Sequence, residues 1–523
     1  MSTPTPDWCR PDLPPDQFLY GRKGPWPQPS PTHPLKEAAE VLNIPPVETL
    51  VWNATVGERL LITQLGFPGA AALAARMNLT TAIPSDDQFN TLMLNTSYTR
   101  YMKPVADVDR QRYGSKIPSA AGFKYDFSAM RLVKPLEGMY CAPVVCFFAQ
   151  GPQKQRGCVA IAFRGETHGE DVFVLPSGGA AWNVAKVYAL QAAAYHMLFV
   201  VHPLLHFPMD SVNAITKTAV PYIHPLFQAL HPHTSYTLAL DNAVLEGPES
   251  VINTNAQGSW VDPFMGNAYN LKLLFGAGYT GLEGWYGDAY PPYDYMQPQM
   301  GFDSDYGGWL AAYFPPFLDL CTAVADEILS ASPKDTYVKR WARYNHTYVQ
   351  GFPDENAILD KECLARAMAI FMWDVTVAHG GDHYSFGMNI PAPYKFLRIR
   401  NYGPVKGPLP AGPTMVGDIV NGDDLYRAEM AEKMFFTPAA IFPNLGDTLH
   451  PFTSTKLSQE GLDFLIRLKL LSDNYTYSKD TPFMPLTTDQ AQQVLTSDPP
   501  TPGNPSLIEV TPLALTIPAS IQY

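Results

Sequence analysis

The apolar residues of this chain are gathered into long stretches rather than spread evenly among polar ones. Residues 180–206 (AAWNVAKVYALQAAAYHMLFVVHPLLH) are rich in alanine and leucine and carry almost no charge, which is typical of a helix buried on all sides. Residues 361–380 (KECLARAMAIFMWDVTVAHG) show the same character. Residues 316–331 are predicted as a further helix, and residues 456–472 as an amphipathic one. The pattern therefore predicts a mainly α fold with long buried helices.

Two apolar runs have the character of strands instead. Residues 139–150 (MYCAPVVCFFAQ) and 158–163 (CVAIAF) flank the polar, glycine-bearing stretch GPQKQRG, an arrangement that predicts a β-hairpin. We therefore expect a small β subdomain beside the helices. Residues 258–320 are rich in Gly, Tyr, Pro and Asp and are expected to form long loops with short helices.

The N-terminal residues differ in composition from the rest of the chain. Residues 1–46 contain twelve prolines, which fix φ, remove backbone donors and so exclude regular helix or sheet interior. They could form an arm that docks through its aromatic residues, or a disordered tail. The expected organisation is a Pro-rich arm over residues 1–50, followed by a single large domain over residues 51–523.

Composition narrows the class of protein. The chain has 523 residues with 46% hydrophobic and 16% charged residues, enough apolar material for a large core. A net charge of −13 disfavours nucleic-acid binding, which needs a basic face. The six cysteines include no CxxC pair. With no signal peptide or membrane span predicted, we expect a cytoplasmic protein, and a monomer.

Histidines in the apolar helices suggest a metal site. His202 and His206 are four residues apart, as are His379 and His383, and this spacing puts each pair on one face of a helix. Neutral imidazole binds iron, manganese, copper and zinc. A single pair at this spacing is often fortuitous, but two pairs on two buried helices could meet around one ion. The zincin pattern is excluded, because no glutamate follows the first histidine of either pair.

The stretch that contains the first pair resembles the lipoxygenase signature. In that family, a helix with two iron-ligand histidines leads to a His-Pro-[Ile/Leu] motif and then to a phrase like HPHxRYT. Here the corresponding residues are His206, His224-Pro225-Leu226 and His231 to Thr237. The resemblance covers roughly residues 80–523 and implies a lipoxygenase-like helical catalytic domain. We expect a minimal form, without the family's N-terminal lipid-binding β-sandwich.

The same resemblance implies the remaining ligands. The family motif His-Ala-Ala-Val-Asn/His corresponds here to His379-Gly380-Gly381-Asp382-His383. The family chain ends in a motif like Ile-Pro-Asn-Ser-Ile-Ser-Ile, whose terminal carboxylate binds iron, and this chain ends Ile517-Pro518-Ala519-Ser520-Ile521-Gln522-Tyr523. The implied metal ligands are His202, His206, His379, His383 and Tyr523, with His202, His206 and His379 as the catalytic set. The implied ion is non-haem iron, or manganese.

This chain departs from the family at the first ligand. The family's first two ligands are five apart, which would fall on Val201, and the nearest histidine is His202. A π-type widening suits the five-residue gap, whereas an ordinary α-turn would suffice for four. Pro203 is expected to kink the helix. The alternatives to His202 are a site with three histidines or, less favoured, His196.

Other departures concern the surroundings of the metal. Phe386 replaces a glutamine that the family often has, and the segment around Glu246 differs as well. Because neighbouring hydrogen bonds tune a metal, these changes leave the substrate open. Ala268 aligns with the position where Ala or Gly helps set the face of oxygen attack, so it is assigned to the substrate and oxygen pocket; an ordinary packed alanine is the alternative.

The resemblance implies a dioxygenase that inserts O₂ into a polyunsaturated fatty acid or a similar 1,4-diene lipid. In that chemistry an M(III)–OH centre abstracts hydrogen and a hydroperoxide forms. One alternative is a related oxidase or isomerase that acts on a non-fatty-acid polyene or a specialised metabolite. A second is a non-catalytic relative with a degraded metal site.

Overall fold

The computed structural model describes residues 46–61, 72, 75–151, 156–235, 237–241, 264, 274, 294–298, 300, 303–403, 412–436, 444–474 and 517–521. Residues 1–45 lie outside this set, and α1 begins at Pro46, so the last residues of the predicted arm are helical. The α-helices are α1 (Pro46–Leu61), α3 (Asp86–Leu94), α4 (Asp107–Tyr113), α5 (Ala180–His196), α6 (Pro203–Ala219), α7 (Pro225–Leu230), α8 (Thr237–Asp241), α10 (Asp305–Ala331), α11 (Thr336–Tyr348), α12 (Lys361–Trp373), α13 (His379–Tyr384), α14 (Gly422–Phe436) and α15 (Thr455–Asn474).

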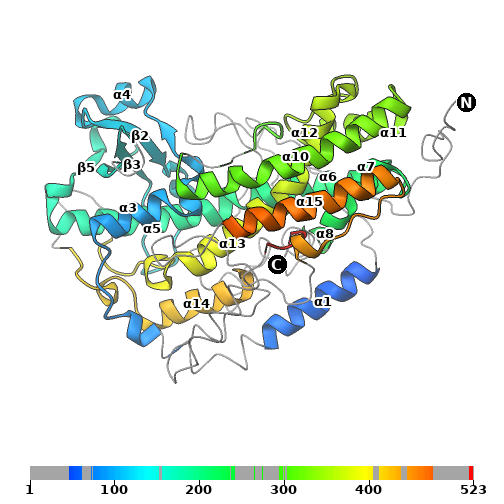
Figure 1. Ribbon diagram of the computed structural model, residues 1–523. Helices are drawn as coiled ribbons and strands as arrows, with labels where there is room; N and C mark the ends of the chain where they lie inside the picture. Colours follow the sequence, from blue (N-terminus) through cyan, green and yellow to red (C-terminus); the bar gives the residue numbers. More distant parts are fainter. Residues whose placement is uncertain are drawn as a thin grey trace, which may run out of the picture.

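Helices dominate the structure, as the sequence predicts, and a small sheet lies at one end (Figure 1). Among the described residues the sheet has five strands: β1 (Lys103–Pro104), β2 (Ala121–Asp126), β3 (Val144–Ala149), β4 (Cys158–Phe163) and β5 (Val172–Val174). They form an antiparallel meander in chain order. The predicted hairpin is β3–β4, with Val144 opposite Phe163.

The central strand β3 is apolar throughout because both of its faces are covered. Val144, Cys146 and Phe148 point into the core that contains α5, whereas Val145 and Phe147 join a smaller cluster with Tyr113. This division follows the alternation of side chains along a strand. The inner face of the sheet therefore packs against the first buried helix.

The two apolar stretches predicted as buried helices form the centre of the molecule. The first runs from Ala180 to Ala219 as α5, the π-helical turn η9 (Met197–Val201) and α6. This run is long and apolar enough to cross a membrane by composition, but its most apolar window is completely buried inside the fold. Its apolar character is thus explained by the core.

The second buried helix continues further than the sequence predicted. After α12 come the π-helical turn η14 (Asp374–Ala378), α13 and a second π-helical turn, η15 (Ser385–Asn389). The helix predicted to end near residue 380 therefore extends to Asn389. The second histidine pair lies within the helix rather than at its end.

The prediction of loops over residues 258–320 was wrong for the last part of that region. Helix α10 begins at Asp305 and includes Pro315 and Pro316, although the sequence placed the start of a helix at 316. The Ser304 side chain caps α10 by accepting from the Gly307 N–H at 2.9 Å, and buried residues continue along the helix on both sides of the prolines. Packing of α10 against α12 and α15 outweighs the proline cost. Most of residues 258–302 lie outside the described set.

The buried residues divide into two large hydrophobic cores. One contains α5 and the inner face of the sheet, and the other contains α10, α12 and α15. The first histidine-bearing helix passes from one core to the other, since Val200 and Phe207 belong to the first core and Leu205 and Met209 to the second. The boundary between the cores is therefore where the histidines lie.

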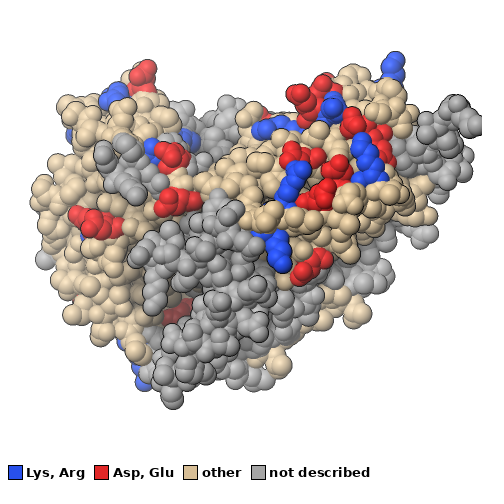
Figure 2. All heavy atoms as spheres, in the orientation of Figure 1, with Lys and Arg blue, Asp and Glu red and all other residues tan. Residues whose placement is uncertain are grey.

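The surface over α10, α11 and α15 carries intermingled acidic and basic side chains (Figure 2). Asp326 of α10 faces both Lys361 and Lys456, at 3.6 Å and 3.2 Å, so ion pairs connect α10 with α12 and α15. Exposed pairs of this kind contribute little to stability, and the apolar core holds these helices together.

Candidate metal centre

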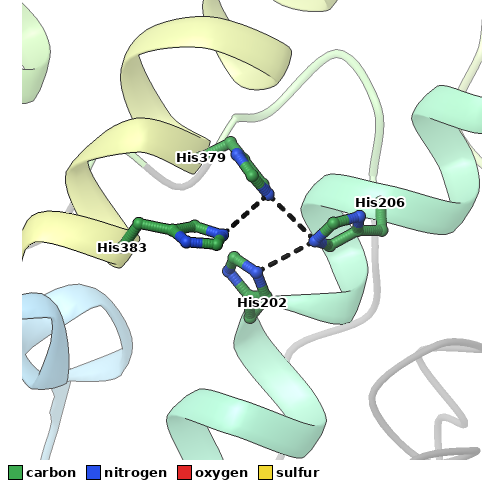
Figure 3. A group of neighbouring side chains, drawn as sticks. All are labelled: His202, His206, His379 and His383. Atoms are coloured by element: carbon green, nitrogen blue, oxygen red, sulfur yellow. Dashed lines mark hydrogen bonds between the residues drawn. The ribbon is translucent and has the colours of Figure 1, made fainter. Parts of the chain in front are cut away.

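Four histidines from the two buried helices converge on one point (Figure 3). His202 and His206 come from the junction of η9 with α6, and His379 and His383 from α13. One ring nitrogen of each lies within 4.8 Å of those of the other three, and all four side chains are buried. The structure therefore brings together all four histidines that the sequence singled out.

The contacts between the rings cannot all be hydrogen bonds. The Nε2 atoms are 2.9 Å apart for His202 and His206, 2.9 Å for His206 and His379, and 3.2 Å for His379 and His383. A neutral imidazole nitrogen carries either one hydrogen or one in-plane lone pair. The Nε2 atoms of His206 and His379 each face two neighbours, so one donor or lone pair would have to serve two partners. A single cation at the centre, facing four lone pairs, satisfies all four nitrogens at once.

The spacing of the nitrogens fits a transition-metal ion. With metal–nitrogen distances of about 2.1 Å, ligands at right angles around an ion are about 3.0 Å apart. The three observed contacts of 2.9–3.2 Å match that separation. An all-imidazole site suits iron, manganese, copper, nickel or zinc, and not calcium or magnesium, which take oxygen ligands. The donor set thus fits the iron or manganese ion that the resemblance implies.

Burial keeps the central imidazoles neutral. It lowers the pKa of His206 well below its usual value, and nearby His202 lowers it further. Burial also lowers the pKa of His379 strongly, with added effects from His383 and His206. A neutral imidazole has a lone pair to offer, so both residues are prepared as ligands at neutral pH.

The π-helical turn η9 explains how His202 can replace a ligand displaced by one residue. The His202 N–H bonds to the Met197 carbonyl at 2.9 Å, five residues back, as in a π-helix. Pro203 then begins α6. It has no N–H for the carbonyl four residues back, and the widened turn just before it accommodates that loss. The ordinary α-turn that suffices for a four-residue gap lies between His202 and His206, and the π-type widening lies before His202.

His196, the less favoured substitute for His202, and Val201, where the family's spacing would place the first ligand, lie outside the four-histidine group. His196 is buried against Phe127, with ring centroids 5.3 Å apart, and is not part of the four-histidine group. Val201 is buried in a small cluster with Leu204. The geometry therefore favours His202 over both of these positions.

An acidic residue that sequence reasoning missed lies next to the histidines. Asp382, within the His379–His383 motif, is fully buried, and its Oδ2 is 3.5 Å from Nδ1 of His202. Arg100 donates to the same oxygen at 3.0 Å, and the Tyr306 hydroxyl donates to Oδ1 at 2.7 Å. Burial alone would raise the pKa of Asp382, but Arg100, His202 and Tyr306 outweigh it and lower the pKa. The carboxylate is therefore ionised.

The C-terminal segment, residues 517–521, is docked beside the histidines. Leu445 donates its N–H to the Ile517 carbonyl at 2.8 Å, and Ile521 is buried in the second core. Nδ1 of His233 donates to the Ala519 carbonyl at 2.7 Å. Tyr523, the implied carboxylate ligand, lies outside the described residues, so its position remains a prediction.

Gly380 shows how closely this segment approaches the metal-site helix. A Cβ atom at Gly380 would lie 2.9 Å from Cδ of Pro518, inside ordinary contact distance. The neighbouring Gly381 is crowded from α10, because a Cβ there would lie 2.7 Å from Cζ3 of Trp309. Two glycines inside a helix are costly, and here each allows another element to reach the site.

The remaining residues named in the sequence analysis lie at different places in the structure or outside its described part. His224, in the His-Pro-Leu motif, caps α7 by accepting from the Leu226 N–H and is outside the four-histidine group. Phe386 is buried in the first core, with Nζ of Lys395 4.8 Å from its ring centroid. Ala268 and Glu246 lie outside the described residues, so the pocket assignment for Ala268 stays a prediction.

Comparison with known proteins identifies the fold. No family model matches the chain, and no curated protein matches it significantly. Among solved structures, a manganese lipoxygenase aligns with a TM-score of 0.66 at 14% identity, covering 96% of this chain and 95% of that one. Manganese lipoxygenase of Gaeumannomyces graminis aligns with a TM-score of 0.63 at 14% identity, over 87% of this chain and 90% of that one.

Two further structures come from larger chains. A coral 8R-lipoxygenase, described as activated by calcium through a C2-like domain, aligns with a TM-score of 0.63 at 13% identity, over 96% of this chain and 79% of that one. This chain spans 65% of a calcium-dependent 11R-lipoxygenase, which aligns over 84% of this chain with a TM-score of 0.58 and 14% identity. These likenesses show a lipoxygenase-like fold.

Proposed function

We propose that this protein is a non-haem metal dioxygenase that converts a 1,4-diene lipid, such as a polyunsaturated fatty acid, into a hydroperoxide. The observation that carries the proposal is the convergence of four buried imidazoles, with Nε2 contacts of 2.9–3.2 Å, in a lipoxygenase-like fold. The ion that fits is iron or manganese, and manganese lipoxygenases are among the similar structures. When bound, such an ion supplies one-electron oxidation for removing a hydrogen atom from a weak C–H bond.

The residues of the chain supply the conditions for that chemistry. His202, His206, His379 and His383 would hold the ion, and the neutral state of His206 and His379 leaves their lone pairs available. The docked C-terminal segment supports the proposal that Tyr523 adds a carboxylate, which would offset part of the ion's charge. Negative charge at the site favours the higher oxidation state.

The apolar surroundings suit the proposed substrate and its radical. The histidines lie where the two hydrophobic cores meet and their side chains are buried, which supports a site with little water. A dry site prevents side reactions of reactive intermediates. O₂ is itself apolar and adds to the carbon radical, so that one substrate molecule and one O₂ give one hydroperoxide.

Oxygen uptake tests this proposal. The purified, metal-loaded protein is assayed with a panel of polyunsaturated fatty acids, with monounsaturated acids that lack the doubly allylic methylene as controls. We expect oxygen uptake and conjugated-diene absorbance with the former group only, and neither with the His379→Ala variant. No uptake with any polyunsaturated acid by a protein that holds iron or manganese would refute the fatty-acid substrate.

A second substrate class is favoured by one observation. Phe386, where the family often has a hydrogen-bonding glutamine, is buried and apolar, so a hydrocarbon ring stands where the family has a polar amide. The same metal chemistry could then act on a non-fatty-acid polyene or terpenoid. Uptake with such a compound, and none with fatty acids, would favour this alternative.

A further inference from the structure

Asp382 is an unusual residue for its position. It lies on α13 one residue before His383, where the lipoxygenase motif quoted above has valine, and its side chain is fully buried. Moving an ionised carboxylate out of water is costly unless hydrogen bonds and an opposite charge compensate. Three groups from three separate elements surround it.

Both carboxylate oxygens have partners. Oδ1 accepts from the Tyr306 hydroxyl at 2.7 Å. Oδ2 accepts from the Arg100 guanidinium at 3.0 Å and also faces Nδ1 of His202 at 3.5 Å. The carboxylate thus connects Arg100 of η3 (Ser97–Tyr101) and Tyr306 of α10 with the first histidine of the site.

The surrounding structure holds these partners in place. The segment η3 is tied to the metal-site helix because the Ser97 N–H donates to Oγ of Ser385 at 2.6 Å. Tyr306 can approach because residue 381 is glycine, where a Cβ would lie 3.1 Å from the Tyr306 hydroxyl oxygen. Arg100, Tyr306 and Asp382 are all buried, so the surrounding packing restricts their movement.

The network is directed at one histidine in particular. Among the described residues no carboxylate lies within ion-pair distance of His206 or His379, whereas Oδ2 of Asp382 lies 3.5 Å from Nδ1 of His202. In His202, Nδ1 faces Asp382 while Nε2 faces the other histidines. A carboxylate beside Nδ1 favours the tautomer that carries its proton there, which leaves the lone pair on Nε2.

We propose that Asp382 is a positioning residue that fixes the tautomer and orientation of His202 and increases its electron donation to a bound redox metal. Arg100 and Tyr306 act by holding the carboxylate. This inference rests on the metal site of the proposed function. It also explains how a histidine displaced by one residue can serve as a ligand, because Asp382 fixes the ring from the opposite helix.

The alternative is that Asp382 is only half of a buried ion pair that joins η3 to α13. The two roles differ in what they do to the metal. A purely structural pair changes stability when it is removed, and leaves the affinity and reduction potential of the folded protein unchanged. A carboxylate beside a ligand changes both, since loss of such partners typically lowers metal affinity 10–100-fold.

The test measures metal affinity by chelator competition, together with the reduction potential and electron paramagnetic resonance spectrum of the bound ion. We expect Asp382→Asn to raise the dissociation constant of the metal roughly 10–100-fold. The reduction potential should rise, because the substitution weakens binding of the oxidised ion more than binding of the reduced ion. Each tenfold difference between these two losses of affinity raises the potential by about 59 mV. The electron paramagnetic resonance spectrum should change as well.

A double variant protects the test against misfolding. Asp382→Asn leaves the Arg100 charge buried, whereas Arg100→Met with Asp382→Leu removes both charges, a replacement that proteins often tolerate. The matched control is Asp109→Asn, which removes a buried carboxylate paired with Lys124 at 2.5 Å near the sheet. We expect weakened metal binding in the double variant and unchanged metal binding in the control.

The outcomes separate this inference from the proposed function. Wild-type protein that binds no iron or manganese would overturn both. A different result would overturn only the role of Asp382. In that case the wild-type protein binds one of these ions, and the folded Asp382 variants bind it with an affinity within about twofold of the wild type and with unchanged reduction potential and spectrum.

Discussion

Replacing Gly380 with alanine tests whether the docked C-terminal segment supports the metal site. A Cβ at this position would lie 2.9 Å from Cδ of Pro518, whereas carbon atoms in contact are about 3.5–4.0 Å apart. Either Pro518 moves by more than half an ångström, or the segment leaves its place. We expect Gly380→Ala to loosen residues 517–521 and to weaken metal retention.

The magnitude follows from two opposing effects. Alanine in place of glycine inside a helix is favourable by about 1 kcal/mol, whereas overpacking a filled site costs about 1–3 kcal/mol. If the segment stays docked, the variant is less stable by up to about 2 kcal/mol. If the segment undocks, the favourable helix propensity of alanine remains. The hydrogen bonds to the carbonyls of Ile517 and Ala519 are then lost, at a cost of about 1 kcal/mol each.

Gly308 provides a matched control for the helix effect. It lies in α10, is exposed, and a Cβ there would meet nothing within 4 Å, so Gly308→Ala should be stabilising by up to about 1 kcal/mol. The assays are urea unfolding, metal loss during dialysis against a chelator, and hydrogen exchange of residues 517–521. The reasoning would be refuted if Gly380→Ala matched Gly308→Ala in stability and matched the wild type in metal retention and exchange.

Three further outcomes are expected. His202→Gln should lower the metal content sharply, whereas His196→Gln should leave it unchanged; equal loss, measured by elemental analysis, would contradict the ligand assignment. Burial raises the pKa of Asp374 to about 7, with Arg100 opposing the rise, so the folded state keeps a proton that the unfolded state loses above pH 4. The free energy of unfolding of the wild type therefore falls as pH rises from 4 to 7. Asp374→Asn lacks this titration, so its free energy of unfolding relative to the wild type should increase by up to about 4 kcal/mol over that range. A difference between the two proteins in urea unfolding that does not change with pH would refute this. Pro203→Ala should leave metal content unchanged, because the His202 N–H bond to Met197 does not depend on the proline; loss of metal from the folded variant would show that the proline is needed.

Features that depend on local sequence patterns could be predicted, whereas features that depend on contacts between distant residues could not. Residues 180–206 are apolar on every side, and His379 and His383 have helical spacing, so local patterns were enough to predict two buried helices that carry histidines. The hairpin of β3 and β4 was equally local. By contrast, the first turns of α10 make long-range contacts, such as the hydrogen bond from the Tyr306 hydroxyl to Asp382 of α13, and the local signal at Pro315 and Pro316 pointed to a later start.

The network around Asp382 had no local signal. Arg100 and Asp382 are 282 residues apart, and Tyr306 and Asp382 are 76 apart, so no spacing in the sequence connects them. Gly380 and Gly381 were visible as departures from alanine in the family motif, but their reason lies in the approach of Pro518 and Trp309. The position of the π-helical turn before His202 likewise became apparent only from the backbone hydrogen bonds.

The central claim is that the four histidines hold one redox-active ion, and the metal content of the purified protein tests it most directly. The measurement compares the wild type with a His379→Ala variant and with a variant that lacks Tyr523. We predict about one iron or manganese ion per wild-type chain, loss of that ion in His379→Ala, and weaker retention without Tyr523. Stoichiometric zinc, or a wild-type protein that takes up no metal from iron- or manganese-containing buffer, would contradict the account.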